Sequence, residues 1–479
     1  MSSDVTLLSA TEQAALIRSL ELSARELLDA TLARLDAVNP AINAVVVTQR
    51  ELAAERAIQA DNDAARGTFW GPLHGLPITV KEVLDWVGTP STWGVPELAM
   101  YMPKRNATVV DRLLDAGAVL YGKTNVPIML GEWQAYNAIY GTTNNPWDLT
   151  KTPGGSSGGS AVAVATGMTS IEIGSDIGGS IRVPASYCGV FGHKSTFGSI
   201  AVAGHEFPGQ AGVVDINVLG PMTRTAADLE LAWHVLADHP TMYPPMKTKL
   251  ADFTAAVMLT NEIGEQDDEV TNALQAAVDA LVDAGLTVDP AARPAIDQME
   301  QYENYRLLVR AANGGVEPDE ALAQAAIDAQ RYDEGDRHYT VLEAKGATMT
   351  HRDWILAHNR REEFRRAWTA FFGDVDVLLC PITATVAPPH EHDVPFGDQQ
   401  LVVNGNRVSI IDQWFWSGWS CGVYLPSTMV PIGLGRSGLP VGLQVVAPFR
   451  HDRTAIAFAA EVERVLGPAP VPPVPPPAA

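Results

Sequence analysis

The stretch that governs the interpretation of this 479-residue chain reads Pro153-Gly154-Gly155-Ser156-Ser157-Gly158-Gly159-Ser160, followed closely by Asp176-Ile177-Gly178-Gly179-Ser180-Ile181-Arg182. Gly and Ser at this density usually form a flexible linker. Here, small residues at 161–167 predict a helix directly after the first stretch, and residues 170–175 predict a strand directly before the second. The two stretches therefore connect packed elements, and we expect them to form a site.

Short apolar runs broken by Gly and Pro surround these stretches. Residues 76–80, 118–122, 171–175 and 374–380 predict buried strands, and helical patterns alternate with them. This alternation is typical of an α/β fold with a largely buried sheet.

The organisation along the chain favours one continuous domain over residues 1–467. Residues 1–66 are expected to be N-terminal helices, residues 71–230 the core that carries the motifs, and residues 255–365 a helical excursion. Within this excursion, residues 300–345 are a candidate lid. Residues 468–479 are rich in proline and predict a polyproline-like tail.

The charge balance excludes some classes of partner. The chain has 33 Lys and Arg against 56 Asp and Glu, a formal net charge of −23. Duplex binding rests on clustered Lys and Arg, so we expect no nucleic-acid partner. No apolar run reaches the roughly 18 residues of a membrane-spanning helix, and the start MSSDVTLLSATEQ does not resemble a secretory signal. We expect a cytoplasmic protein with no membrane contact.

A metal site is not expected either. The three cysteines, Cys188, Cys380 and Cys421, form no CxxC pair and are interpreted as inert core thiols. The run His390-Glu391-His392-Asp393 has no further ligands at a recognisable spacing, which favours a solvated loop.

A phosphate cradle is the first functional hypothesis for the glycine-rich stretches, and it fails. A Walker A loop requires Lys directly after its last glycine, and neither stretch is followed by that Lys. In the nearest approach, residues 189–195, His193 separates the glycine from Lys194.

Nucleophilic catalysis fits the second stretch better. Backbone N–H groups of Ile177, Gly178 and Gly179 can converge on one point, because glycine adopts the required φ angles and carries no Cβ. Ser180 would then lie beside its own oxyanion hole. Neither stretch contains a histidine, so the base must come from elsewhere. Lys81 ends an apolar run, and burial there would lower its pKa from about 10.4 to about 7 or 8.

Five ordered motifs resemble those of the amidase signature family. They are residues 75–82 (GLPITVKE), 122–125 (GKTN), 144–148 (NNPWD), 154–161 (GGSSGGSA) and 176–182 (DIGGSIR). The likeness extends from the N-terminal helices to residues 438–444 (GLPVGLQ) and therefore covers nearly the whole chain. It implies an α/β/α sandwich around a large mixed β-sheet.

The resemblance also implies the roles of individual residues. The Ser-cisSer-Lys triad of the family corresponds to Ser180, Ser156 and Lys81, with Ser156 on a cis peptide bond. The oxyanion hole corresponds to the backbone of Ile177, Gly178 and Gly179. By the family's layout, Leu130 and Gly131 line the acyl pocket. The family's chemistry needs neither a metal nor an organic cofactor.

Asp176 and Arg182 flank the proposed nucleophile. Arg pairs readily with carboxylates, so we expect an ion pair that holds the loop.

The family hosts several activities, so the substrate stays open. Residues 126–134 (VPIMLGEWQ) resemble free-standing bacterial amidases that act on aryl amides and urethanes, which favours an amide or carbamate substrate with side esterase activity. The alternative is the glutamine-hydrolysing subunit of a tRNA-dependent amidotransferase. A catalytically dead binding module is disfavoured, because all three triad positions are present. Trp414, Trp416 and Trp419 form an aromatic patch in a loop-like context, and either the core or the pocket entrance could contain them.

Overall fold

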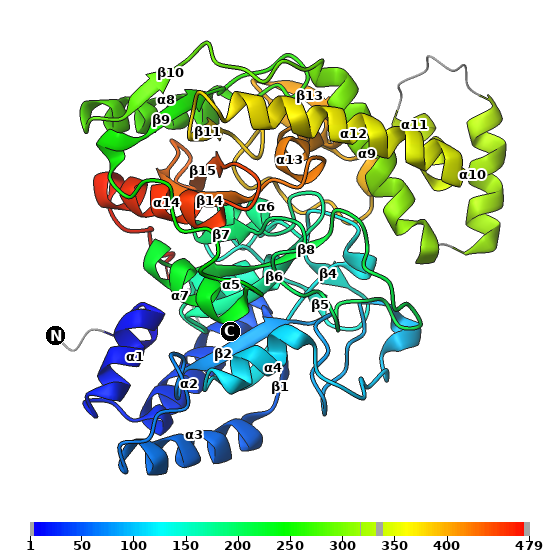
Figure 1. Ribbon diagram of the computed structural model, residues 1–479. Coiled ribbons are helices and arrows are strands. Elements are labelled where there is room, and N and C mark those ends of the chain that lie inside the picture. The colour runs from blue at the N-terminus through cyan, green and yellow to red at the C-terminus, as the bar shows by residue number, and fades with distance from the viewer. Residues whose placement is uncertain (1–3, 317, 332–338, 474–479) are drawn as a thin grey trace.

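A mixed β-sheet of eight strands forms the centre of the molecule (Figure 1). The computed structural model describes residues 4–316, 318–331 and 339–473. The strand order is β10-β9-β11-β15-β14-β7-β8-β6. Their bounds are β6 (Ile171–Asp176), β7 (Phe191–Lys194), β8 (Val218–Thr223), β9 (Thr254–Val257), β10 (Thr287–Asp289), β11 (Val377–Cys380), β14 (Ser427–Leu434) and β15 (Pro440–Val446). β9 runs parallel to β10 and β11, and the other pairings are antiparallel. The predicted α/β fold with a mixed sheet is confirmed.

Helices cover both faces of this sheet because its central strands are apolar on both sides. Val441, Leu443 and Val445 of β15 pack on one face in the cluster that includes α8 (Asp268–Asp283) and α14 (Asp452–Leu466). Side chains alternate along a strand, so Val446 packs on the other face, with the aromatic residues of α13 (Trp414–Cys421).

A second sheet of three strands brings the N-terminal half to the site. Its order is β1 (Val45–Thr48), β3 (Val119–Thr124) and β2 (Pro77–Lys81), with β2 parallel to β3. β2 also lies against β6 of the large sheet. This contact places Lys81, the last residue of β2, beside the strand that leads into the Asp176–Arg182 stretch.

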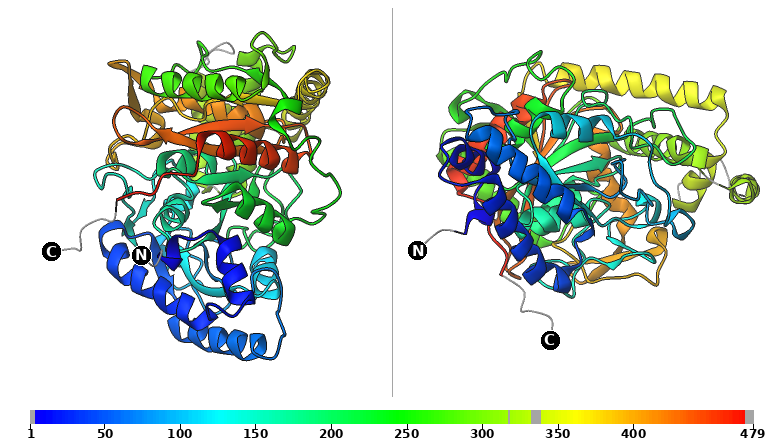
Figure 2. Two further views of the ribbon diagram at one scale, coloured as in Figure 1. Left: turned by 90° about the vertical axis from the view of Figure 1, so that its left-hand side faces the viewer. Right: turned by 90° about the horizontal axis from the view of Figure 1, so that it is seen from below.

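The remaining elements complete the chain. The other helices are α1 (Ala10–Arg18), α2 (Ala24–Ile42), α3 (Arg50–Ala64), α4 (Thr108–Asp115), α5 (Gly158–Ala165), α6 (Arg182–Cys188), α7 (Ala226–Leu236), α9 (Gln298–Asn313), α10 (Asp319–Arg331), α11 (Tyr339–Ala347) and α12 (His351–Phe371). Short 3-10 helices are η1 (Val5–Leu7), η2 (Pro96–Leu98), η3 (Ile128–Leu130), η4 (Leu250–Asp252), η5 (Gly314–Val316), η6 (Phe396–Asp398) and η7 (Ile410–Gln413). Two small hairpins pair β4 (Tyr136–Asn137) with β5 (Gly141–Thr142), and β12 (Gln400–Val403) with β13 (Asn406–Ser409). Figure 2 shows α1, α2 and α3 together at one end of the molecule.

The prediction of a purely helical block over residues 255–365 is wrong at its start. β9 and β10 lie there and form one edge of the large sheet. At four and three residues, these two strands are too short to show a period that separates them from helix. The tail prediction is only partly described, since residues 468–473 contain neither helix nor strand and residues 474–479 lie outside the described residues.

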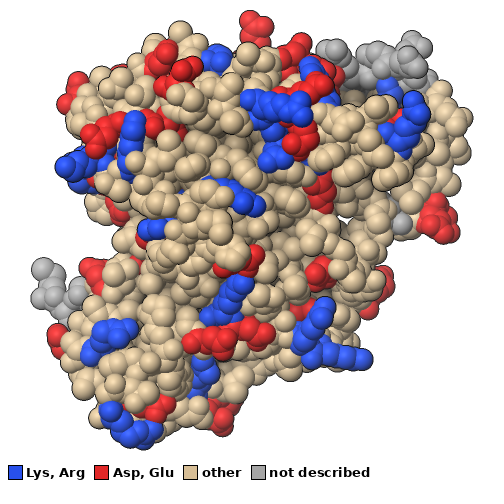
Figure 3. Space-filling view, in the orientation of Figure 1, with Lys and Arg blue, Asp and Glu red and all other residues tan. Residues whose placement is uncertain are grey.

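Three further findings concern the cysteines, the side chains that bind metals and the hydropathy of the helices. All three cysteines are buried and free of disulfides. Across the described residues, no group of His, Cys, Asp and Glu side chains could hold a metal ion. Over the same part of the chain, every helix is too short or too polar to cross a bilayer. Acidic and basic side chains are interspersed over the face in Figure 3.

The close approach of β7 and β8 yields a stability prediction. A Cβ at Gly220 in β8 would overlap the carbonyl oxygen of His193 in β7, so Gly220→Ala must push the strands apart. We expect a loss of about 1–3 kcal/mol of unfolding free energy, typical of overpacking. Thermal unfolding followed by circular dichroism measures it.

Gly212→Ala is the matched control, because a Cβ at Gly212 meets no heavy atom within 4 Å. Equal melting temperatures for the two variants would contradict the packing argument.

Candidate active site

Lys81 is the centre of a buried group of hydroxyls. Its side chain is fully buried at the end of β2. Its Nζ lies 2.7 Å from Ser156 Oγ, 2.9 Å from Ser157 Oγ and 2.9 Å from Ser175 Oγ. A neutral amine donates two hydrogen bonds and accepts one, so three hydroxyls satisfy it completely. The first glycine-rich stretch supplies two of them and β6 supplies the third.

Burial sets the protonation of this amine. It lowers the pKa of Lys81 to about 7, against the opposing charges of Asp176 and Glu172. Glu172, on β6, is itself buried and accepts hydrogen bonds from Thr124 Oγ1 at 2.8 Å and from the N–H of Ile173 at 2.6 Å. Burial raises the pKa of Glu172 to about 7. Near neutral pH, both groups therefore lose much of their charge.

The two glycine-rich stretches are bonded to each other. The peptide bond between Gly155 and Ser156 is cis, as the resemblance implied. One residue on, the N–H of Ser157 donates to the carbonyl oxygen of Ser180 at 3.1 Å. The serine beside Lys81 and the proposed nucleophile thus belong to one connected backbone arrangement.

The peptide groups before Ser180 are individually held. Tyr305 Oη donates to the carbonyl oxygen of Ile177 at 3.1 Å, and Trp133 Nε1 donates to that of Gly178 at 3.0 Å. The N–H of Gly179 donates to Asp176 Oδ1 at 2.8 Å. The N–H groups of Ile177 and Gly178 have no acceptor among the residues that the structure describes. They are therefore the N–H groups of the predicted trio that remain available to a ligand.

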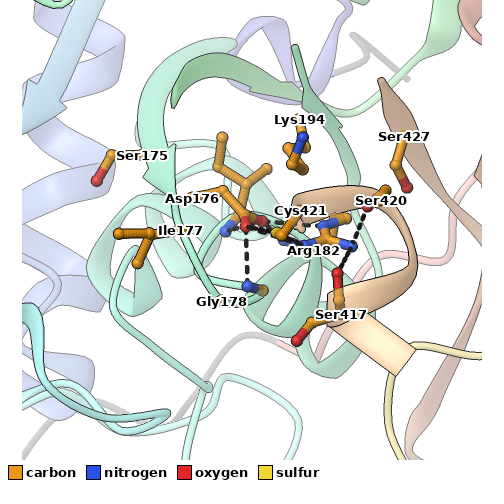
Figure 4. Close-up of polar contacts among 12 residues, drawn as sticks. Ser175, Asp176, Ile177, Gly178, Arg182, Lys194, Ser417, Ser420, Cys421 and Ser427 are labelled. Atoms are coloured by element: carbon orange, nitrogen blue, oxygen red, sulfur yellow. Dashed lines mark hydrogen bonds and ion pairs between the residues drawn. The ribbon is translucent and has the colours of Figure 1, made fainter. Parts of the chain in front are cut away.

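Asp176 and Arg182 form the expected ion pair (Figure 4). Arg182 Nη2 lies 2.9 Å from Asp176 Oδ1 and Nε lies 3.0 Å from Oδ2, and both side chains are fully buried. Burial alone would raise the pKa of Asp176, but the charge and hydrogen bonds of Arg182 hold it below its usual range. Arg182 also donates to Ser420 Oγ at 2.9 Å and to Gln444 Oε1. The pair thus ties the loop before Ser180 to α13 and β15.

Ser180 opens on a cavity of about 280 Å³. Its wall is mainly apolar, and Leu130 and Gly131 belong to it. Its aromatic members are Trp93, Trp133, Phe207, Phe396 and Trp414. Arg310 and Glu343 also line it, with Arg310 Nε 3.1 Å from Glu343 Oε2.

The tryptophan patch divides between the cavity and the core. The prediction of a loop for this segment is wrong, because the segment forms α13. Trp414 lines the cavity, whereas Trp416 and Trp419 are buried in the core. Every residue from Phe415 to Cys421 is buried, so the segment is a helix enclosed by the core, and its Gly and Ser residues lie within that helix.

The candidate lid also borders the cavity. Val309 and Asn313 of α9, Val316 of η5 and Glu343 of α11 contribute to the wall. Tyr305 of α9 and Glu172 of β6 were not identified as site residues from the sequence. Tyr305 belongs to none of the sequence motifs. Glu172 lies within an apolar strand, and its partner Thr124 belongs to the other sheet, so only the tertiary structure shows the two together.

Comparison with known proteins shows the family to which the chain belongs. A sequence profile of the family described as Amidase matches residues 26–456. The chain is 33% identical to an indoleacetamide hydrolase of Bradyrhizobium diazoefficiens, covering 96% of this chain and 86% of the relative. It is 32% identical to an acylamidase of Rhodococcus erythropolis, covering 96% and 95%.

One component of a tRNA-dependent amidotransferase is about equally similar. The chain is 31% identical to a glutamyl-tRNA(Gln) amidotransferase subunit of an Anaeromyxobacter species, covering 95% of each. Among solved structures, a bacterial aryl acylamidase of the amidase signature family superposes with a TM-score of 0.81 over 97% of each chain, at 24% identity, which shows the shared fold. The profile match and these relatives establish that the chain belongs to the amidase signature family.

Proposed function

We propose that this protein hydrolyses the C–N bond of neutral aryl amides through an acyl-enzyme on Ser180. The observation that carries the proposal is the buried Lys81 amine, 2.7 Å from Ser156 Oγ, next to a serine that opens on an aromatic cavity. A base whose pKa is close to the working pH is what proton transfer from a serine requires.

The proposed reaction has two stages, acylation of Ser180 and hydrolysis of the acyl-enzyme. Ser180 Oγ attacks the amide carbon and gives its proton to Ser156 Oγ, which passes its own proton to Lys81 Nζ. The proton returns along the same path to the leaving nitrogen as the C–N bond breaks. Water then attacks the acyl-enzyme through the same relay and releases the carboxylic acid. Protein groups supply the whole sequence, so the proposal includes no cofactor.

The oxyanion hole uses the backbone before Ser180. The available N–H groups of Ile177 and Gly178 are the proposed donors to the developing oxyanion. The N–H of Gly179, predicted as a third donor, is bonded to Asp176 and serves instead to hold the loop.

The cavity wall supports a neutral aromatic substrate. Trp93 and Phe207 pack edge to face at 5.5 Å between ring centroids, and Phe396 lies 5.8 Å from Trp414. Aromatic walls favour flat apolar groups. The names of the indoleacetamide hydrolase and the acylamidase support the same class. A carbamate presents a similar carbonyl, and an ester forms the same acyl-enzyme with a better leaving group, so both are proposed as secondary substrates.

Glutamine hydrolysis for an amidotransferase is the second candidate. The 31% identity to one amidotransferase component favours it. Free glutamine carries an ammonium and a carboxylate, which need charged partners when buried. Among the described residues of the cavity wall, Arg310 is the arginine that could bind the carboxylate of glutamine, and it already pairs with Glu343. This pairing favours the neutral substrate.

The choice between these substrates is tested by amine release from four compounds: an acetanilide-type aryl amide, an aryl carbamate, a primary aliphatic amide and glutamine. We expect turnover of the aryl amide, and a loss of at least about 10³-fold in kcat for Ser180→Ala, comparable to other nucleophile deletions. Turnover of glutamine alone, or activity that survives Ser180→Ala, would contradict the proposal.

The protonation of Lys81 sets the pH dependence. Because burial lowers its pKa to about 7, the amine becomes protonated below pH 7 and cannot accept the serine proton. We expect kcat/KM for the aryl amide to fall about tenfold per unit below pH 7 and to level off above it. Lys81→Arg, which stays protonated, should be inactive throughout. A profile that stays flat from pH 5 to 8 would argue against Lys81 as the base.

A further inference from the structure

Tyr305 connects the candidate lid to the loop before the nucleophile. It lies on α9, which also contributes Val309 and Asn313 to the cavity wall. Its hydroxyl donates to the carbonyl oxygen of Ile177 at 3.1 Å, across 128 residues of sequence. A Cβ on Gly178 would lie 3.2 Å from the same hydroxyl. Tyr305 therefore contacts the peptide group that joins Ile177 to Gly178.

The ring of Tyr305 is fixed by its surroundings. Its side chain is 1% exposed, and α13 faces it with glycine. A Cβ on Gly418 would lie 2.8 Å from Tyr305 Cδ1, so an alanine there would have to displace the ring. Burial also raises the pKa of Tyr305 well above its usual value, so the hydroxyl remains a donor.

The hydrogen bond sets the direction of an N–H group. In a trans peptide, the C=O and N–H bonds point in opposite directions. With the carbonyl oxygen of Ile177 held by Tyr305, the N–H of Gly178 must point away from the Tyr305 hydroxyl. Gly178 and Ser180 both line the cavity, and this N–H has no acceptor among the described residues.

We propose that Tyr305 is a positioning residue, whose hydroxyl fixes the Ile177–Gly178 peptide so that the Gly178 N–H meets the oxyanion formed when Ser180 attacks. The inference rests on the proposed function, since it requires an acyl transfer at Ser180. It assigns to a residue outside the sequence motifs a share in transition-state stabilisation. It also means that α9 contacts both the substrate cavity and the loop before Ser180 that contains Ile177 and Gly178, called the oxyanion loop below.

Tyr302 provides a matched control on the same helix. It lies one turn before Tyr305, is also buried, and its hydroxyl donates to the carbonyl oxygen of Ile411 at 2.6 Å. Replacing either tyrosine with phenylalanine removes one buried hydroxyl and its bond to a backbone carbonyl, and Tyr305→Phe also removes a hydrogen bond with Ser417. The two bonds differ in their acceptor: Ile411 belongs to η7, whereas Ile177 belongs to the oxyanion loop.

The experiment compares Tyr305→Phe, Tyr302→Phe and the wild type in aryl amide hydrolysis. We expect Tyr305→Phe to lower kcat about 10- to 100-fold and to leave KM within about twofold of the wild-type value. This loss is smaller than the roughly 10²- to 10³-fold loss in kcat that follows removal of an oxyanion-hole donor itself, because the Gly178 N–H is still present. Affinity for an aryl trifluoromethyl ketone, which forms a tetrahedral oxyanion adduct with serine, should fall by a similar factor. In Tyr305→Phe, the fall in kcat/KM below pH 7 should keep its midpoint. Tyr302→Phe should leave kcat, KM and the affinity for the trifluoromethyl ketone within about twofold of the wild-type values.

Unchanged affinity of Tyr305→Phe for the trifluoromethyl ketone, or equal losses in the two phenylalanine variants, would overturn the inference. If the wild type hydrolyses only glutamine, the same comparison is made on glutamine. Activity that does not depend on Ser180 would contradict the proposed function itself. Ser180-dependent activity that Tyr305→Phe leaves intact would contradict this inference alone.

Discussion

The buried amine of Lys81 is the constraint on which the site depends. Moving an ammonium into a dry interior costs several kcal/mol unless a counter-charge or a change of protonation compensates. Here three serine hydroxyls within 2.9 Å satisfy the amine, while burial lowers its pKa to about 7. The contact of β2 with β6, and the backbone bond from Ser157 to Ser180, keep these groups together.

The two carboxylates that act on Lys81, Asp176 and Glu172, raise its pKa by less than burial lowers it. Asp176 is paired with Arg182 through two contacts of 3.0 Å or less, so its charge is already compensated. Glu172 is buried, and its own pKa rises to about 7. Arg182, bonded to α13 and β15, fixes the loop before Ser180 and keeps Asp176 in an ion pair of its own. The ion pair of Asp176 and Arg182 is therefore distinct from Lys81, the group that gains and loses a proton in the proposed reaction.

The sequence reveals the parts of the site that its motifs contain. Local patterns contain the two glycine-rich stretches, the apolar run before Lys81 and the Asp176–Arg182 pair. The structure confirms the strand that ends at Lys81 and the ion pair between Asp176 and Arg182. Tyr305 could not be found this way, because its partner Ile177 is 128 residues distant and no spacing rule relates them. The strands β9 and β10 do not show in the sequence, because four and three residues are too few for a distinctive period. In α13, local Gly and Ser suggest a loop, but these residues are buried together with Trp416 and Trp419 in a helix enclosed by the core.

The proposed chemistry requires Lys81 to be largely neutral at the pH where the protein works. NMR titration of protein labelled with ¹³C at the lysine ε carbons tests this most directly, with the Lys81 signal assigned by its loss in Lys81→Met. We expect a midpoint near pH 7, the value to which burial lowers the pKa of Lys81. A midpoint above about 9, close to that of an exposed lysine, would contradict the proposed role of Lys81 as the base.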